Sequence, residues 1–217
     1  MKSKAYLEDL IVRYPQLQIC YADILETYEL MRQTYEAGGK LLVAGNGGSC
    51  ADADHIVGEL MKGFCLKRQI PVSFVEKMKA VDGEAGAYLG EHLQGALPAL
   101  ALHTQQALAT AYINDVDGES MLAQALYGYG TDSDCFLAIS TSGNSENIVY
   151  AVVVAKAKGM KVIGLTGRDG GRLRELADVS IIVPEQETFQ IQELHLPIYH
   201  CLCLMLEEYF FGELRRS

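Results

Sequence analysis

The sequence predicts an α/β fold: a three-layer αβα sandwich with a five-stranded parallel sheet and additional N-terminal helices. First, short continuous apolar runs alternate with helical stretches, as they do in parallel sheets that helices cover on both faces. Second, 49% of the residues are hydrophobic and 21% are charged, which is ordinary for a soluble globular protein. A chain of 217 residues can bury a full core, so we expect residues 1–217 to form a single domain.

Residues 1–38 are expected to form the N-terminal helices. Pro15 separates a short first helix from a longer second one, which the glycine pair at 38–39 ends. Along the second helix an apolar stripe at three- and four-residue steps consists of Leu25, Tyr28, Met31 and Tyr35. This stripe can cover the chain's own sheet or pack against a partner subunit, and the sequence leaves both open.

The rest of the chain alternates between strands and helices. The five predicted strands are the apolar runs at 41–45, 97–102, 135–140, 161–166 and 179–183. Helices are predicted at 50–61, 145–158, 171–176 and 188–214. The stretch 63–95 interrupts this rhythm with mixed charge, Gly and Pro, and we expect an insertion or a lid there. In such sheets ligands bind beyond the carboxyl ends of the strands, so functional residues should follow the strands directly.

Composition excludes several classes of function. A net charge of −10 argues against nonspecific binding of nucleic acid, but backbone N–H groups can still hold a small anion. The six cysteines form no CxxC pair and no zinc-finger spacing, which favours reduced thiols in a cytoplasmic protein. The N-terminus lacks the apolar region of a signal peptide, and no run of 18 apolar residues exists. We therefore expect no membrane partner.

Two polar turns follow predicted strands. The first, GNGGS at 45–49, lacks both the third glycine of a dinucleotide fingerprint and the Gly-Lys-Ser/Thr of a P-loop, so no nucleotide cofactor is expected. Alone, it is also compatible with a turn that binds nothing. The second, STSGNS at 140–145, offers four hydroxyls at a helix N-terminus, which suits a dianionic phosphate. An N-cap would explain one of these residues but not the whole cluster.

Acid–base residues lie on two predicted helices. Asp52, His55 and Glu59 share one helical face, where His and Glu four residues apart can share a proton or a metal ion. The alternative is an exposed ion pair of little consequence. On the last helix, Gln192 and His200 are eight residues apart, about 80° around the axis, so they can face one pocket.

Together these segments resemble the SIS (sugar isomerase) family, which has a flavodoxin-like sheet, and within it the phosphoheptose isomerases. The resembling pattern is GNGGS-xx-D-xx-H-xxx-E, then Asn-Asp at 114–115, then STSGNS, then Gln-Glu-xx-His-xxxx-His. The resemblance implies an aldose–ketose isomerase that converts sedoheptulose 7-phosphate to D-glycero-D-manno-heptose 7-phosphate through an enediol. It also implies a homotetramer with active sites between subunits, and the apolar last helix at 202–211 favours an oligomer as well.

The resemblance assigns a role to individual residues. Glu59 and His200 would be the catalytic pair. The substrate would contact Asn46, Gly47, Gly48, Ser49, Asn114, Asp115, Ser140, Thr141, Ser142, Ser145 and Gln192. In those family members that bind a zinc ion, the matching positions here are His55, Glu59, Gln192 and His200.

The chain departs from the family pattern at two positions and in one segment. Gly63 stands where members commonly have Arg, Phe189 stands where many have an acidic residue, and 63–95 is longer than usual. These departures leave open an isomerase of another sugar phosphate. A non-catalytic SIS module, which binds a phosphosugar or a replication-initiation protein, is the rival from another class. Retention of Glu59 and His200 favours the enzyme, because a binding module needs neither.

Overall fold

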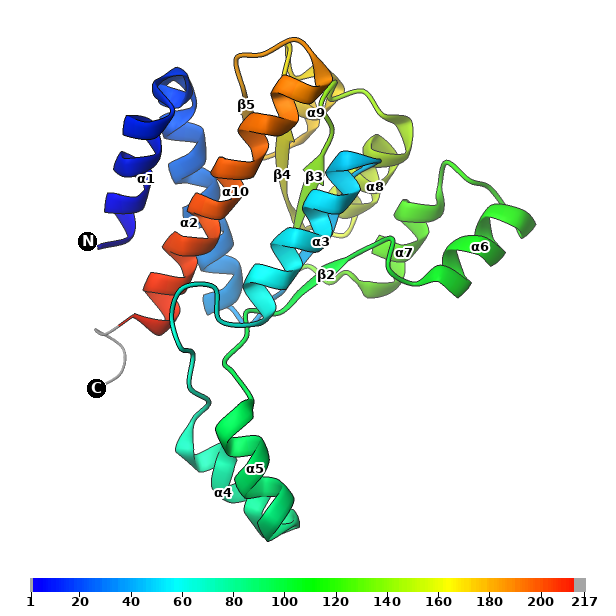
Figure 1. Cartoon of the computed structure of the whole chain (residues 1–217). Helices are drawn as coiled ribbons and strands as arrows, with labels where there is room; N and C mark the ends of the chain where they lie inside the picture. Colours follow the sequence, from blue (N-terminus) through cyan, green and yellow to red (C-terminus); the bar gives the residue numbers. More distant parts are fainter. Residues whose placement is uncertain (1, 213–217) are drawn as a thin grey trace.

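The computed structural model describes residues 2–212 and confirms the five-stranded parallel sheet (Figure 1). Its strands lie side by side in the order β2-β1-β3-β4-β5, and every neighbouring pair is parallel. In chain order the strands are β1 (Leu41–Ala44), β2 (Ala99–Ala101), β3 (Cys135–Ile139), β4 (Lys161–Thr166) and β5 (Val179–Ile182). The strand order switches between β1 and β3: β2 lies on one side of β1, and β3, β4 and β5 follow on the other. Ligands are therefore expected at the carboxyl ends of β1 and β3.

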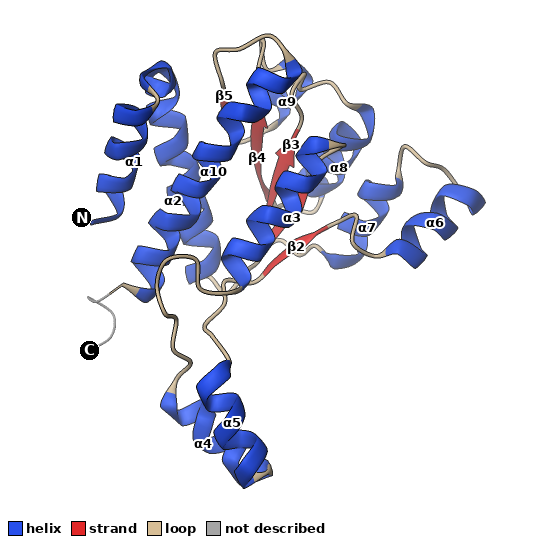
Figure 2. Cartoon of the chain, in the orientation of Figure 1, coloured by secondary structure: helices blue, strands red, loops and turns tan. Residues whose placement is uncertain are grey.

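Helices cover both faces of the sheet, so the predicted three layers are confirmed (Figure 2). One face packs against α1 (Lys2–Arg13), α2 (Tyr21–Glu36), α3 (Gly48–Met61) and α10 (Thr188–Phe211). The other packs against α7 (Met121–Tyr129), α8 (Glu146–Ala157) and α9 (Gly171–Leu176). Within β1, Leu41 and Val43 face the first core and Leu42 and Ala44 the second, which is why the strand is apolar throughout.

The N-terminal helices cover the chain's own sheet. A 3-10 helix (Pro15–Cys20) joins α1 to α2, and α1 packs along α10. Tyr28 and Met31 of the apolar stripe are buried in the first core, with Leu25 and Tyr35 packed against it. Much of the apolar part of α10 is buried in the same core, including Leu202, Met205 and Leu206. These side chains therefore do not argue for a subunit interface, and the oligomeric state stays a prediction.

The stretch 63–95 forms a helical hairpin that projects from the body (Figure 1). Its helices are α4 (Val72–Val81) and α5 (Gly83–His92), and a bridge between Gln69 and Gln94 closes its neck. Gly86 lets the two helices approach closely, because a Cβ there would collide with the backbone of α4. Gly86 is also the one residue buried in the two helices, so the hairpin has no core of its own. It leaves the body at the C-terminal end of α3, away from the turn at 45–49.

Other details of the fold differ from the sequence prediction. Helices α6 (Gln106–Asp115) and α7 were not predicted. Pro197 lies inside α10, where a proline usually disturbs a helix, yet α10 is continuous through it, because buried neighbours on both sides hold the helix in place. Residues 1 and 213–217, which include the end of the predicted last helix, lie outside the described residues. Among residues 2–212, no helix has both the length and the apolar character needed to cross a membrane.

Candidate active site

The turn between β3 and α8 forms a cradle of hydroxyl groups, as predicted for a phosphate site. Ser140 is buried directly after β3, and its Oγ lies 3.1 Å from the Oγ of Ser145. Ser145 occupies the N-cap position of α8, but its side chain does not cap the helix. Thr141 and Ser142 are half-buried beside them, and Ser142 Oγ accepts the backbone N–H of Asn144 at 3.2 Å. The simple N-cap explanation is therefore wrong for Ser145, and the helix N-terminus can receive an anion.

The turn after β1 lies beside this cradle. The side chains of Asn46 and Asn147 exchange two hydrogen bonds of 2.9 Å and so join the turn to the first turn of α8. Gly47 has a φ of 55°, a conformation that favours glycine, and the backbone of Gly48 begins α3. Ser49 is buried in that first turn. The two polar turns thus meet at the carboxyl ends of β1 and β3, at the switch in strand order.

Gln192 joins the same region from α10. Its side-chain amide lies 2.6 Å from the position that a Cβ on Gly48 would take, so any larger residue at 48 would displace it. The sequence analysis placed both residues in the substrate site, and the structure brings them together.

The helices α3 and α10 pack side by side, and we call the line of contact between them the seam. An acid–base cluster lies on this seam, further from the two polar turns. His55 Nε2 is 3.3 Å from Glu59 Oε1 on α3 and 3.3 Å from His200 Nε2 on α10. The ring of Phe64 packs against His200, with the ring centroids 5.5 Å apart. Glu59 is mostly buried, and its second oxygen, Oε2, accepts no hydrogen bond but lies 3.8 Å from Lys62 Nζ. The structure therefore unites the two predicted catalytic residues with His55.

The electrostatics of the cluster keep His200 neutral. Burial lowers the pKa of His200 below its ordinary value, and the neighbouring His55 lowers it further, while Glu59 opposes the shift. A neutral imidazole can both accept and donate a proton. A carboxylate oxygen that accepts no hydrogen bond, in the same cluster as such an imidazole, is the arrangement expected of an acid–base pair.

The sequence analysis missed Tyr199, which is buried next to the cluster. Its hydroxyl lies 3.1 Å from Asp52 Oδ1 and 3.0 Å from His55 Nδ1. Burial raises the pKa of Tyr199, and the nearby Asp52 raises it further, so the phenol keeps its proton. From sequence alone, a tyrosine in an apolar helix such as α10 cannot be distinguished from a residue that only packs in the core.

A buried ion pair, also missed, anchors the far end of the seam. Arg68 Nε donates to Glu207 Oε1 at 2.8 Å, and both side chains are almost fully buried. The Glu207 carboxylate also accepts three consecutive backbone N–H groups, at 64–66. Arg68 donates in turn to the backbone carbonyls of Leu60 and Glu59, at 2.6 and 2.8 Å. The pair therefore ties the last turn of α3, which carries Glu59, to α10.

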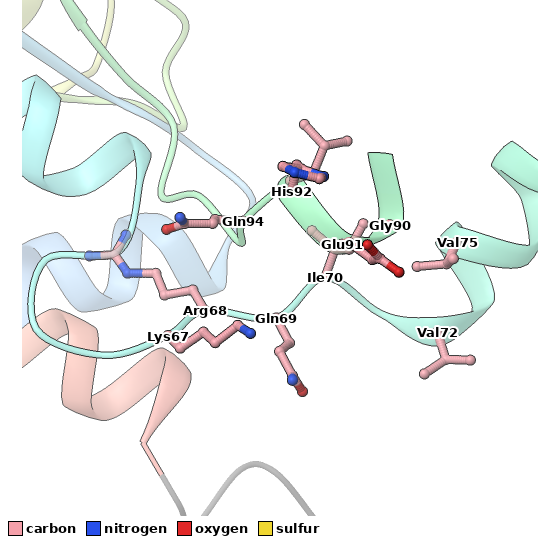
Figure 3. A pocket seen from close by; sticks show the side chains of 11 residues that line it. Lys67, Arg68, Gln69, Ile70, Val72, Val75, Gly90, Glu91, His92 and Gln94 are labelled. Atoms are coloured by element: carbon pink, nitrogen blue, oxygen red, sulfur yellow. The ribbon is translucent and has the colours of Figure 1, made fainter. Parts of the chain in front are cut away.

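One cavity of about 410 Å³ lies beside the turn at 140–145 and is lined by Asp169, Gly171, Arg174 and Glu175. A cavity of about 530 Å³ opens at the neck of the hairpin, and Arg68 extends from its wall toward the body of the molecule (Figure 3). A smaller cavity of about 170 Å³ is lined by α10 residues that include His200, together with Phe64, Arg13 and Tyr14. Of these three cavities, the smallest is the one lined by a residue of the acid–base cluster, so the candidate site lies along the seam.

Asn114 and Asp115 are not brought to this site within one chain. They end α6, which lies on the other side of α3 from α10 (Figure 1), and both are exposed. Their side chains bond each other, with Asn114 Nδ2 donating to Asp115 Oδ1 at 2.8 Å. Their predicted role in substrate binding needs another subunit or a movement of α6.

The fit of a zinc ion depends on the seam residues. Two imidazole nitrogens and a carboxylate oxygen face each other at His55, His200 and Glu59, and these are donors that zinc prefers. Gln192, the fourth predicted ligand, contacts Gly48, which lies about 10 Å along α3 from His55. Within residues 2–212, no group of three or more His, Cys, Asp or Glu residues has its donors arranged to hold a metal ion. His55, His200 and Glu59 are therefore of the right chemical type for zinc, but the structure does not arrange them with Gln192 as a complete set of ligands.

Comparison with known proteins agrees with these features. A family model described as SIS domain matches residues 78–167. A protein named phosphoheptose isomerase from Aneurinibacillus thermoaerophilus is 39% identical over 179 residues, which is 82% of this chain and 77% of that protein.

Solved structures agree with both the fold and the sequence relationship. A phosphoheptose isomerase from Francisella tularensis superposes with a TM-score of 0.74 at 32% identity, covering 95% of this chain and 97% of that one. One from Neisseria gonorrhoeae gives 0.69 at 30% identity, covering 95% and 92%. This chain therefore belongs to the phosphoheptose isomerase family of SIS-domain sugar-phosphate isomerases.

Proposed function

We propose that the chain interconverts sedoheptulose 7-phosphate and D-glycero-D-manno-heptose 7-phosphate. The observation that carries this proposal is the meeting of Glu59, His55 and His200 on the seam, between the two helices that also meet at the turn beside the phosphate cradle. A module that only binds a phosphosugar needs the cradle but has no use for a carboxylate beside a neutral imidazole. Family membership supports the same reaction class.

The reaction requires two proton movements. Glu59 removes a proton from C1 of the ketose while the carbonyl oxygen at C2 gains one, which gives the 1,2-enediol. The hydroxyl at C1 then loses its proton to become the aldehyde, and the carboxyl group of Glu59 gives a proton to C2, which returns Glu59 to its ionised form. His200, neutral and able to donate and accept, moves the proton between the two oxygens.

Other residues hold the substrate. Hydroxyls of Ser140, Thr141, Ser142 and Ser145, together with the N-terminus of α8, receive the phosphate. Asn46 and the backbone of Gly47 and Gly48 contact the sugar beside Gln192. His55, Glu59 and His200 can hold a zinc ion, with Gln192 as the proposed fourth ligand. Such an ion would supply Lewis-acid polarisation of the carbonyl.

The site is proposed to be completed across subunits of a homotetramer in the cytoplasm. Two observations support a shared site: Asn114 and Asp115 lie away from the seam, and the cavity beside His200 holds only about 170 Å³. Light scattering at micromolar concentration tests this. A mass near the 23.8 kDa of one chain would contradict both the tetramer and the shared site.

A substrate panel tests the proposed reaction. Purified protein is incubated with ketose and aldose phosphates of five, six and seven carbons, and interconversion is followed by NMR. We expect the seven-carbon pair to react fastest. Faster turnover of a shorter sugar would correct the substrate, and binding without any turnover would favour the non-catalytic SIS module.

A further inference from the structure

Tyr199 is the residue through which Asp52 reaches the acid–base cluster. The phenol is 1% exposed, and its hydroxyl lies between two polar atoms, Asp52 Oδ1 at 3.1 Å and His55 Nδ1 at 3.0 Å. Its ring also meets the ring of His55 edge to face, with centroids 5.4 Å apart. The sequence placed Asp52 on the same helical face as His55 and Glu59 but gave it no role, and it did not single out Tyr199.

The number of protons decides the direction of these hydrogen bonds. A phenol has one proton to donate, and a carboxylate can only accept. The Tyr199 hydroxyl therefore donates to Asp52, and its oxygen is left to accept from His55. An imidazole that donates from Nδ1 carries its lone pair on Nε2 when it is neutral.

We propose that Asp52 and Tyr199 are positioning residues that hold His55 in the tautomer protonated at Nδ1. The lone pair of Nε2 then faces His200 Nε2 at 3.3 Å, and Asp52 and Tyr199 hold this tautomer against Glu59 Oε1, an acceptor also at 3.3 Å that favours a proton on Nε2. The lone pair of Nε2 accepts the N–H of His200 or binds a cation. This consequence for catalysis rests on the proposed function, whereas the tautomer itself does not.

The tautomer can be measured directly by NMR. Protein labelled with ¹⁵N in histidine and freed of metal by chelation gives long-range ¹H–¹⁵N correlations that separate protonated from unprotonated ring nitrogens. For wild-type His55 we expect a protonated Nδ1 and an unprotonated Nε2. In Tyr199→Phe the acceptor is gone, so the form protonated at Nε2 should appear, and kcat should fall about tenfold with KM changed less than twofold.

A matched control removes a phenol hydroxyl elsewhere. Tyr35 is also buried, its hydroxyl has no hydrogen-bond partner, and it lies outside the site, so Tyr35→Phe should leave the His55 tautomer and kcat unchanged. Asp52→Asn is a second variant, in case Tyr199→Phe fails to fold. Its amide can donate to the phenol, which turns the phenol proton toward His55 and should raise the population protonated at Nε2.

Two results would overturn the proposal. One is a wild-type His55 protonated at Nε2, and the other is an unchanged tautomer in the Tyr199 and Asp52 variants. Because the NMR readout needs no turnover, an inactive wild-type enzyme would count against the proposed function and leave the tautomer measurement valid.

Discussion

The two ends of α3 carry different parts of the candidate site and are built in different ways. At the N-terminal end, the turns at 45–49 and 140–145 are made largely from neighbouring residues, joined by the Asn46–Asn147 pair. At the C-terminal end, side chains distant in sequence hold α3 against α10, and the Arg68–Glu207 pair spans 139 residues. Each turn of the first end is a product of local sequence, although the pair that joins them spans 101 residues, whereas the second end exists only in the folded chain.

This difference assigns different chemistry to the two ends. A turn of hydroxyls and N–H groups can bind a phosphate but cannot move a proton from carbon. The seam instead holds acid–base groups, with His55 3.3 Å from both Glu59 and His200, and burial lowers the pKa of His200. Variants at the two ends should therefore change different measured quantities.

The largest expected effect is on turnover at the seam. Glu59→Gln and His200→Gln are near-isosteric and remove acid–base capacity, so each should lower kcat by about 10²–10⁴-fold with the melting temperature nearly unchanged. Glu84→Gln, at an exposed position on the hairpin, is the matched control and should retain full activity. Full turnover in either seam variant would remove that residue from the mechanism.

The next effect is on stability. Glu207→Gln leaves the buried Arg68 charge without its partner, which should lower the free energy of unfolding by about 3–5 kcal/mol in urea titrations. Glu76→Gln breaks the exposed pair with Lys79 and should cost less than about 1 kcal/mol. An equal, small loss in both variants would show that the ion pair does not hold the seam.

At the N-terminal end of α3 the affected quantity is substrate affinity. Replacing Ser140, Ser142 and Ser145 together by Ala removes three groups that can donate to the phosphate, so KM should rise by about 10²-fold or more. The kcat at saturating substrate should change far less than in the seam variants. An unchanged KM would place the phosphate elsewhere.

The smallest expected effect is on the pH dependence of stability, through His195 on α10. His195 is buried, and burial lowers its pKa to about 4, although its Nε2 bonds the carbonyl oxygen of Thr166. In the unfolded chain His195 gains a proton near pH 6.5, whereas in the folded chain it stays neutral down to about pH 4. The free energy of unfolding should therefore be highest above pH 7 and should fall as the pH drops toward 4. The loss between pH 7 and pH 5 should be about 2 kcal/mol, measured by urea unfolding at each pH. His195→Gln should remove that part of the slope, and an unchanged slope would contradict the assignment.

The sequence predicted those parts of the fold that depend on local patterns. Continuous apolar runs marked all five strands, because both faces of a covered parallel sheet are buried. The polar turns were equally visible, since glycines and hydroxyls directly follow two of the runs. Helix α6 was missed because, with no buried residue, it shows no clear apolar stripe.

Long-range contacts in the site had no sequence signal. Spacing predicted that His55 and Glu59 share one helical face, the resemblance paired Glu59 with His200, and in the structure these three side chains lie together. Nothing local indicates that Tyr199 reaches across 147 residues to Asp52, or that Arg68 turns into the body and not toward the hairpin. The burial of Leu202 and Met205 within one chain was likewise missed, because an apolar helix looks the same in a core and at an interface.

The central claim, that Glu59 on this seam moves a proton from carbon through an enediol, is tested most directly by solvent deuterium. Sedoheptulose 7-phosphate is incubated with the wild-type protein and with Glu59→Gln in D₂O, and deuterium at C2 of the aldose and at C1 of the remaining ketose is measured by NMR. The proposed mechanism predicts deuterium at carbon with the wild type and about 10²–10⁴-fold slower incorporation with Glu59→Gln. Isomerisation without deuterium in either sugar, or equal incorporation by both proteins, would contradict it.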